Sequence, residues 1–310
     1  MRTTAQRQIA TMAVAAAVAT GCSSAKPGTA AAPGARPART ITIVAAENFW
    51  GSIVAQLAGK AGNVTSIVTD PNADPHNYET SSADARAVAG ADYVILNGAG
   101  YDAWAQELIS GNPNPKRKVL TVADLVGAKV GDNPHLWYNP DYVTIAMNRF
   151  EADLKALDPA DSAYFDAQRA AVNQAFAPYW ARLAEIKAAF AGTPVASTES
   201  IFVYLAHYLG LDVISPPELM QAVAEGNDPP APSVAQFQTQ IARKEFKVLV
   251  YNEQTVTEVT TNLKKQAADQ DIPIVGVTET IQPPDATFEQ WFEGQLEQLQ
   301  NALNANALGQ

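Results

Sequence analysis

The stretch ADSAYFDAQRAAVNQAFAPYWARLAEIKAAFA, residues 160–191, separates two halves of the chain that share one kind of pattern. Its large apolar residues recur at helical spacings, which predicts an amphipathic connecting helix of about 30 residues. Pro178 lies inside it and removes one backbone hydrogen bond, so we expect a kink near residues 174–178 or two helices instead of one. The apolar residues are Phe165, Val172, Phe176, Tyr179, Leu183, Ile186 and Phe190.

Short β-branched runs alternate with helical patterns on both sides of this segment. Such alternation is typical of mostly parallel sheets flanked by helices. The sequence therefore predicts an α/β fold with two lobes bridged by the long helix: an N-terminal lobe over residues 40–158, the connecting helix over 159–192 and a C-terminal lobe over 193–310. The runs are TITIVAA (40–46), VTSIVT (64–69), DYVILN (92–97), VLTV (119–122), PVAS (194–197), LDVI (211–214), VLVYNE (248–253) and IPIVGV (272–277).

The first residues, 1–21, have the pattern of an export signal. Arg2 and Arg7 give a positive start, a short apolar run follows over residues 9–20, and small residues precede Cys22. The run is shorter than the roughly 20 apolar residues that a membrane-spanning helix needs. Cys22 is the only cysteine, and its context resembles a bacterial lipobox, in which the thiol is lipidated. The alternative is a signal cut elsewhere, with Cys22 discarded or left free.

Residues 22–39 hold mostly Ser, Ala, Pro and Gly, which cannot form a core and predict a flexible tether. We therefore expect an extracytoplasmic protein held at the bacterial cell membrane by a lipid anchor. The formal net charge of −11 makes nucleic acid an unsuitable partner and a cation a natural ligand, although acidity also serves solubility. We expect a monomer.

Two of the three histidines lie in similar contexts, His76 in DPHNY and His135 in NPHLWY. A proline before each one restricts the backbone next to the ring, as a metal ligand requires. Asp74 and Asn133 stand where they could orient these rings. The third histidine, His207, lies in an apolar periodic run and is interpreted as a structural side chain.

Carboxylates follow several of the predicted strands, where ligands gather in open α/β sheets. Glu199 comes two residues after PVAS, and Glu279 and Asp285 come after IPIVGV. Glu199 could instead begin a helix, and Asp285 could instead cap the last one. Glu253, at the end of VLVYNE, and Glu279 are interpreted as groups that support the ligands or anchor loops.

Enzyme motifs are weak or absent. The chain has no HExxH, GxSxG, Walker loop or CxxC motif. The run NGAGYDA imitates a dinucleotide fingerprint, but it follows the third strand and carries Asp102 where a pyrophosphate would dock. The sequence thus predicts no enzyme.

An ordered series of motifs resembles the TroA-like (cluster A-I) solute-binding lipoproteins of manganese, zinc and iron ABC importers. The likeness covers nearly the whole mature length. The motifs are ENFWGSIVAQLAG (47–59), DPHNYETSSAD (74–84), NGAGYDAWAQEL (97–108), NPHLWYNP (133–140), STESIFVYLAHYLGL (197–211) and VLVYNEQT (248–255).

The resemblance implies two lobes with one metal ion held between them. It carries ligand roles onto His76, His135 and Glu199. In the family a final aspartate completes the site, and Asp285 is the best match, with Glu279 next. Zinc-specific members often have a third histidine in place of Glu199 and a His-rich loop, which this chain lacks. Two nitrogens and two carboxylates therefore favour the manganese or iron branch, yet the Irving–Williams order lets Zn²⁺ compete.

The function implied is capture of one divalent ion, Mn²⁺ or Zn²⁺ with Fe²⁺ a third candidate, and its delivery to an ABC transporter permease. Two alternatives have different sequence requirements. An exported zinc hydrolase would need an open coordination position and a general base. A surface adhesin would hold the metal only as a structural ion.

Overall fold

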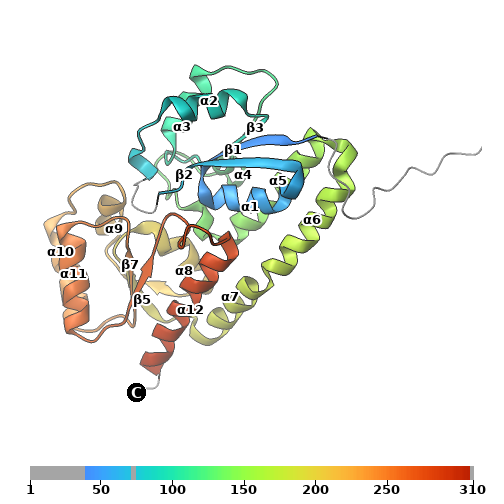
Figure 1. The fold of residues 1–310 in the computed structure, drawn as a ribbon. Helices are drawn as coiled ribbons and strands as arrows, with labels where there is room; N and C mark the ends of the chain where they lie inside the picture. Colours follow the sequence, from blue (N-terminus) through green and yellow to red (C-terminus); the bar gives the residue numbers. More distant parts are fainter. Residues whose placement is uncertain (1–38, 71–74, 308–310) are drawn as a thin grey trace, which may run out of the picture. The chain divides into compact units, whose positions relative to one another are not determined.

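The computed structural model describes residues 39–70 and 75–307 (Figure 1). The predicted signal, the predicted lipidation site Cys22, the predicted tether up to residue 38 and Asp74 lie outside the described residues. All described residues belong to one compact unit. Among them, no helix combines the length and the apolar character needed to cross a membrane.

The N-terminal lobe contains a parallel sheet of four strands. They are β1 (Ile41–Glu47), β2 (Gly62–Val68), β3 (Tyr93–Leu96) and β4 (Lys118–Thr121), and their order in the sheet is β2-β1-β3-β4. In the register, Val44 of β1 pairs with both Thr65 of β2 and Val94 of β3. The carboxyl ends of all four strands therefore lie at one edge of the sheet.

Helices cover both faces of this sheet. Side chains of β1 alternate between the faces: Ile43 packs with the helix α1 (Asn48–Ala58), and Val44 packs on the opposite side with α2 (Ser82–Gly90). This alternation follows from the two-residue period of a strand. The remaining helices of the lobe are α3 (Ala103–Gly111), α4 (Val122–Val126) and α5 (Pro140–Leu157).

The C-terminal lobe repeats the strand order of the first. Its strands are β5 (Pro194–Ser197), β6 (Asp212–Val213), β7 (Leu249–Asn252) and β8 (Ile274–Val277), all parallel and ordered β6-β5-β7-β8. The two sheets confirm the predicted α/β fold, because every predicted run contains a strand. The helices are α8 (Val203–Leu209), α9 (Pro217–Ala224), α10 (Ala231–Ala242), α11 (Glu258–Asp269) and α12 (Phe288–Ala307).

The connecting segment consists of two helices, α6 (Ser162–Ala175) and α7 (Ala177–Phe190), which run along one side of both lobes in Figure 1. The break at Phe176 falls inside the predicted window, two residues before Pro178. Backbone bonds from Phe176 to Val172 and from Trp180 to Phe176 continue across the break. The proline therefore interrupts the ladder only locally.

One apolar core runs through both lobes and the connecting helices. Outside this core, polar contacts tie α1 to the end of the chain. Gln56 donates to Glu289 at 2.9 Å, and the backbone N–H of Phe288 donates to Ser52 at 3.0 Å. The side-chain oxygen of Asn48 accepts from the backbone of Ile281 at 3.2 Å. The lobes are thus joined by packing and by hydrogen bonds, as well as by the chain.

Candidate metal site

Four ionisable side chains from different loops meet beyond the carboxyl ends of the strands. The N-terminal lobe supplies His76, in a short 3-10 turn (Pro75–Asn77) after β2, and His135, after β4 and α4. The C-terminal lobe supplies Glu199, two residues after β5, and Glu279, two residues after β8. Histidine nitrogens thus come from one lobe and carboxylate oxygens from the other.

His135 is fully buried, and its ring is held by its own loop. The side-chain oxygen of Asn133 lies 2.7 Å from His135 Nδ1 and also accepts the backbone N–H of His135 at 3.1 Å. An amide oxygen only accepts, so Nδ1 carries the ring proton and Nε2 has a free lone pair. Asn133 in turn donates to the backbone oxygen of Ser200 at 2.8 Å, across the lobes. The predicted orienting role of Asn133 is confirmed.

His76 is partly exposed and packs against Tyr101, with ring centroids 4.4 Å apart in an edge-to-face arrangement. Its Nε2 lies 3.9 Å from Glu279 Oε2. The hydroxyl of the buried Tyr101 donates to that same oxygen at 2.8 Å. Tyr101 therefore supports both a histidine and a carboxylate. Sequence reasoning did not identify it, although it lies inside the quoted motif NGAGYDAWAQEL.

Glu199 faces the other histidine. Its Oε2 lies 3.9 Å from His135 Nε2 and accepts the backbone N–H of Ile201 at 3.0 Å, at the start of a short 3-10 helix (Ser200–Phe202). Glu199 therefore begins a helix, as one sequence interpretation expected, and it also faces a histidine. Its second oxygen, Oε1, accepts from the side chain of Asn252 at 3.0 Å.

Burial shifts the pKa values of Glu199 and His135. Burial, followed by the nearby charge of Glu279, raises the pKa of Glu199 well above its ordinary value. Burial, followed by the influence of His76, lowers the pKa of His135 well below its ordinary value. Both effects favour neutral forms when no cation is bound, because a charge loses its hydration in a buried place. A metal ion would supply the missing positive charge.

The donors suit a divalent transition metal. One ligand atom each from His76, His135 and Glu279 lies within 4.8 Å of the others. His135 Nε2 is buried without a hydrogen-bond partner among the described residues, and such an orphaned atom is costly unless something binds it. A tetrahedral ion with bonds of about 2.1 Å holds neighbouring donors about 3.4 Å apart. The His76–Glu279 and His135–Glu199 pairs, at 3.9 Å, each need to close by a few tenths of an ångström, whereas Glu199 lies outside the group of three whose atoms are all within 4.8 Å.

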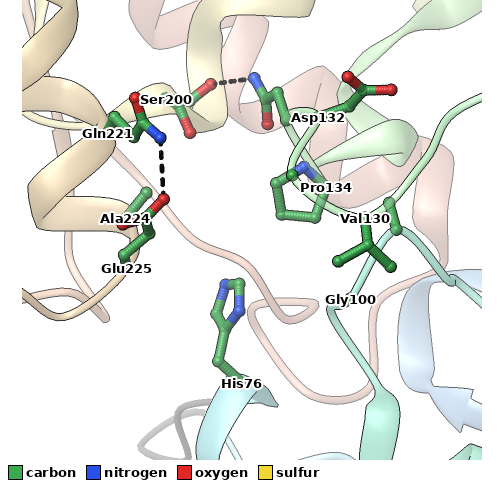
Figure 2. Close-up of a pocket in the computed structure, with 12 residues that line it drawn as sticks. His76, Gly100, Val130, Asp132, Pro134, Ser200, Gln221, Ala224 and Glu225 are labelled. Atoms are coloured by element: carbon green, nitrogen blue, oxygen red, sulfur yellow. Dashed lines mark hydrogen bonds between the residues drawn. The ribbon is translucent and has the colours of Figure 1, made fainter.

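A cavity of about 480 Å³ opens onto His76 and is lined by residues of both lobes, among them Pro134, Ser200 and Gln221. In Figure 2, the His76 ring points into this space, and Ser200 and Gln221 lie on its far side. Of the four site residues, His76 lines this cavity, whereas His135, Glu199 and Glu279 are buried and are not among its lining residues.

The structure does not bring Asp285, the sequence's first choice as fourth ligand, to this group. Asp285 is exposed on the loop between β8 and α12, whereas Glu279 lies beside the histidines. Glu253 is also exposed and pairs with Lys264 at 3.1 Å, so its neighbour Asn252 is the residue that faces the site. The signal for Glu279 was its position two residues after a strand, which Glu199 shares. His207 is exposed on α8, away from the group.

Solved structures of periplasmic metal-binding proteins have the same fold. A manganese-bound protein from Candidatus Liberibacter asiaticus gives a TM-score of 0.71 at 17% identity, covering 86% of this chain and 100% of that one. The periplasmic zinc-binding protein TroA of Treponema pallidum gives 0.70 at 16% identity, covering 85% and 99%. At these identities the likeness concerns the fold.

Sequence comparison identifies the family. The manganese-binding lipoprotein MntA of Halalkalibacterium halodurans is 28% identical over 151 residues, which is 47% of this chain and 48% of that protein. The matched segments span 36% to 60% of the lengths of the curated relatives. The family model described as zinc-uptake complex component A, periplasmic, matches residues 43–302, nearly all of the described chain. The predicted resemblance is confirmed: the chain belongs to this family of periplasmic metal-uptake proteins.

Proposed function

We propose that the protein captures one divalent transition metal ion through His76, His135, Glu199 and Glu279 and delivers it to an ABC importer permease. The observation that carries this proposal is the fully buried His135 Nε2, which has a lone pair, no hydrogen-bond partner among the described residues and a carboxylate oxygen 3.9 Å away. Glu279 takes the ligand role that the sequence assigned to Asp285. The ion is Mn²⁺, Zn²⁺ or Fe²⁺.

Capture is favoured over catalysis by the number of protein donors. Two imidazoles and two carboxylates fill four positions, whereas a hydrolytic zinc site keeps one position open for water and needs a general base beside it. Glu253, a candidate base, is exposed and paired with Lys264. Glu279 is engaged by Tyr101 and Asn252. The geometry therefore supports a binding protein.

The N-terminal sequence and the family support a proposal for where the protein is located and which partner it meets. We propose that Cys22 carries a lipid that holds the protein on the outer side of the cell membrane, and that the monomer presents its loaded form to the permease. Deleting the gene should create a growth requirement for one metal, which the intact gene relieves. Mass spectrometry of the mature protein would detect the lipid on Cys22.

Titration of the metal-stripped protein with Zn²⁺, Mn²⁺ and, under anaerobic conditions, Fe²⁺ tests the proposal. We expect one ion per chain, and a gain of about 2.7 kcal/mol in unfolding free energy at a free-ion concentration of 100 times the Kd. His135→Ala and Glu279→Gln should lose most of the affinity. His207→Ala and Asp285→Asn, both at exposed positions, serve as controls and should retain it. Parent-like binding by Glu279→Gln, with loss in Asp285→Asn, would overturn the ligand assignment.

A further inference from the structure

Asn252 lies between the two carboxylates of the site. It is the last residue of β7 and is fully buried. Its side-chain nitrogen donates to Glu199 Oε1 at 3.0 Å and to Glu279 Oε1 at 2.9 Å. One amide group therefore holds one oxygen of each acidic residue. Among the described residues, Asn252 is the side chain that hydrogen-bonds to both carboxylates.

The orientation of this amide is fixed by its other end. The Asn252 side-chain oxygen accepts the backbone N–H of Gln254 at 2.9 Å. A flipped amide would lose that bond and would turn its oxygen toward two carboxylates, which offer no proton when ionised. The NH₂ group therefore faces both carboxylates and also the hydroxyl of Thr255, at 3.0 Å, so three acceptors share its two hydrogens.

The two carboxylates consequently have unequal oxygens. In each, Oε1 is held by Asn252, while Oε2 lies 3.9 Å from a histidine Nε2. For Glu279, Thr255 donates a second hydrogen bond to Oε1 at 3.0 Å, so both lone-pair positions of that oxygen are occupied. Each Oε2 has one hydrogen bond, from Ile201 or from Tyr101, and keeps a lone pair for an ion.

We propose that Asn252 makes Glu199 and Glu279 one-oxygen ligands, and thereby limits the protein to four donors and favours Zn²⁺ over Mn²⁺. Four N and O donors match the tetrahedral preference of Zn²⁺. Mn²⁺ prefers about six oxygen-rich positions, which two-oxygen binding by the carboxylates would provide. This inference rests on the proposed function, because it concerns the same four ligands. Asn252 acts through them as a positioning residue.

The test compares the ratio of the Mn²⁺ and Zn²⁺ dissociation constants in the parent and in Asn252→Ala. Releasing both Oε1 atoms should lower the Mn²⁺-to-Zn²⁺ Kd ratio by about tenfold. This factor is the lower end of the change in metal affinity seen when a residue that hydrogen-bonds a metal ligand is substituted. Losing the hydrogen bonds also changes the proton affinity of the carboxylates, but this affects both metals alike. The ratio of the two dissociation constants therefore reports how many carboxylate oxygens coordinate the ion.

Co²⁺ provides a spectroscopic readout that a purely structural role would not move. Four-coordinate Co²⁺ absorbs visible light far more strongly than six-coordinate Co²⁺. We expect strong bands for the parent and weak bands for Asn252→Ala. Thr255→Val, which frees one lone pair of Glu279 Oε1, should change the ratio in the same direction by a smaller factor. It keeps the proposal testable if Asn252→Ala does not fold.

Asn97→Ala is the matched control. Asn97 is equally buried and directly follows β3, but its side chain accepts from Trp50 and donates to the backbone oxygens of Gly98 and Pro134. Asn97→Ala should lower the unfolding free energy of the protein and leave the Mn²⁺-to-Zn²⁺ Kd ratio unchanged. A parent-like ratio and Co²⁺ spectrum in Asn252→Ala would overturn the inference while leaving metal capture intact. A parent that binds neither Zn²⁺ nor Mn²⁺ would overturn the proposed function itself.

Discussion

The two lobes place similar residues at corresponding strand ends and use them differently. Glu47 ends β1 and Glu199 follows β5, the corresponding strand of the second sheet, and both are buried. Burial raises the pKa of both, followed by the influence of Asp102 on Glu47 and of Glu279 on Glu199. Yet only Glu199 faces a histidine.

This difference shows that strand-end position alone does not place a buried carboxylate opposite a histidine. A buried carboxyl group needs a compensating positive charge or a proton. In the N-terminal lobe, burial and Asp102 favour the protonated form of Glu47. Glu199 of the C-terminal lobe instead faces the His135 imidazole, which under the proposed function would be a second donor to the same ion. The predictions below test whether the two glutamates differ in this way.

Substitution of the two glutamates should give the largest contrast. Glu199→Gln removes the charge of a proposed ligand, so metal affinity should fall by more than about 100-fold. That factor is the largest loss of affinity usual when only a hydrogen-bond partner of a ligand is removed. Glu47→Gln keeps the size and neutral form of its side chain and should leave affinity unchanged. Calorimetry or chelator competition measures both. Equal losses in the two variants would show that the lobes do not differ as described.

Two buried tyrosines extend the comparison. Tyr101 donates to Glu279, and Tyr93 donates to Asp153 within the N-terminal lobe at 2.9 Å. Tyr101→Phe should weaken metal binding by about tenfold, because a ligand loses its orienting partner. Tyr93→Phe should cost about 1 kcal/mol of unfolding free energy with unchanged affinity. Urea unfolding and metal titration separate these effects, and weaker metal binding by Tyr93→Phe would contradict the assignment.

The pH dependence of binding should come from the C-terminal lobe. Because the pKa of Glu199 is raised, the metal-free protein keeps a proton there above the ordinary range, and a bound ion displaces it. Affinity should therefore rise with pH, by up to about tenfold per pH unit for one proton, until the raised pKa is passed. Calorimetry in buffers of different ionisation enthalpy counts the released protons. Glu47→Gln should release the same number.

The smallest expected effect concerns the stability of the metal-free protein. The pKa of Glu47 in the folded protein lies above its ordinary value of 4.5. Its contribution to the unfolding free energy is therefore fully present below pH 4.5 and is lost as pH rises through the folded-state pKa. Glu47→Gln should remove this decline, at most about 1.4 kcal/mol per pH unit. Urea unfolding above pH 4.5 measures it, with exposed Glu218→Gln as control. An unchanged slope would show that Glu47 is ionised in the folded state.

Much of the fold was predictable because strands and helices have different periods. Every predicted strand run contains a strand, and Pro178 correctly marked the break between α6 and α7. His76 and His135 were identifiable because histidine is rare in this chain and their contexts match. The fourth carboxylate was harder, because Asp285 and Glu279 both follow β8 and the sequence does not show how the loop turns.

Asn252 could not have been found from the sequence pattern. All four residues of β7 are buried, so the strand shows no alternation that would indicate which side chains face the site. Its neighbour Glu253 carries the more conspicuous charge but is exposed. Neutral residues that position ligands leave little trace in composition or charge. They become visible only when the hydrogen bonds of the folded chain are known.

The contacts between α1 and the end of the chain have a consequence for the order of folding. Gln56 bonds a residue 233 positions later, and Ser52 bonds one 236 positions later. Because synthesis starts at the N-terminus, these contacts of α1 can form only after nearly the whole chain has been synthesised. Each lobe can build its own sheet earlier, but the two halves of the site are joined late. A chain truncated before α12 would keep all four donor residues and lose these tethers between the lobes.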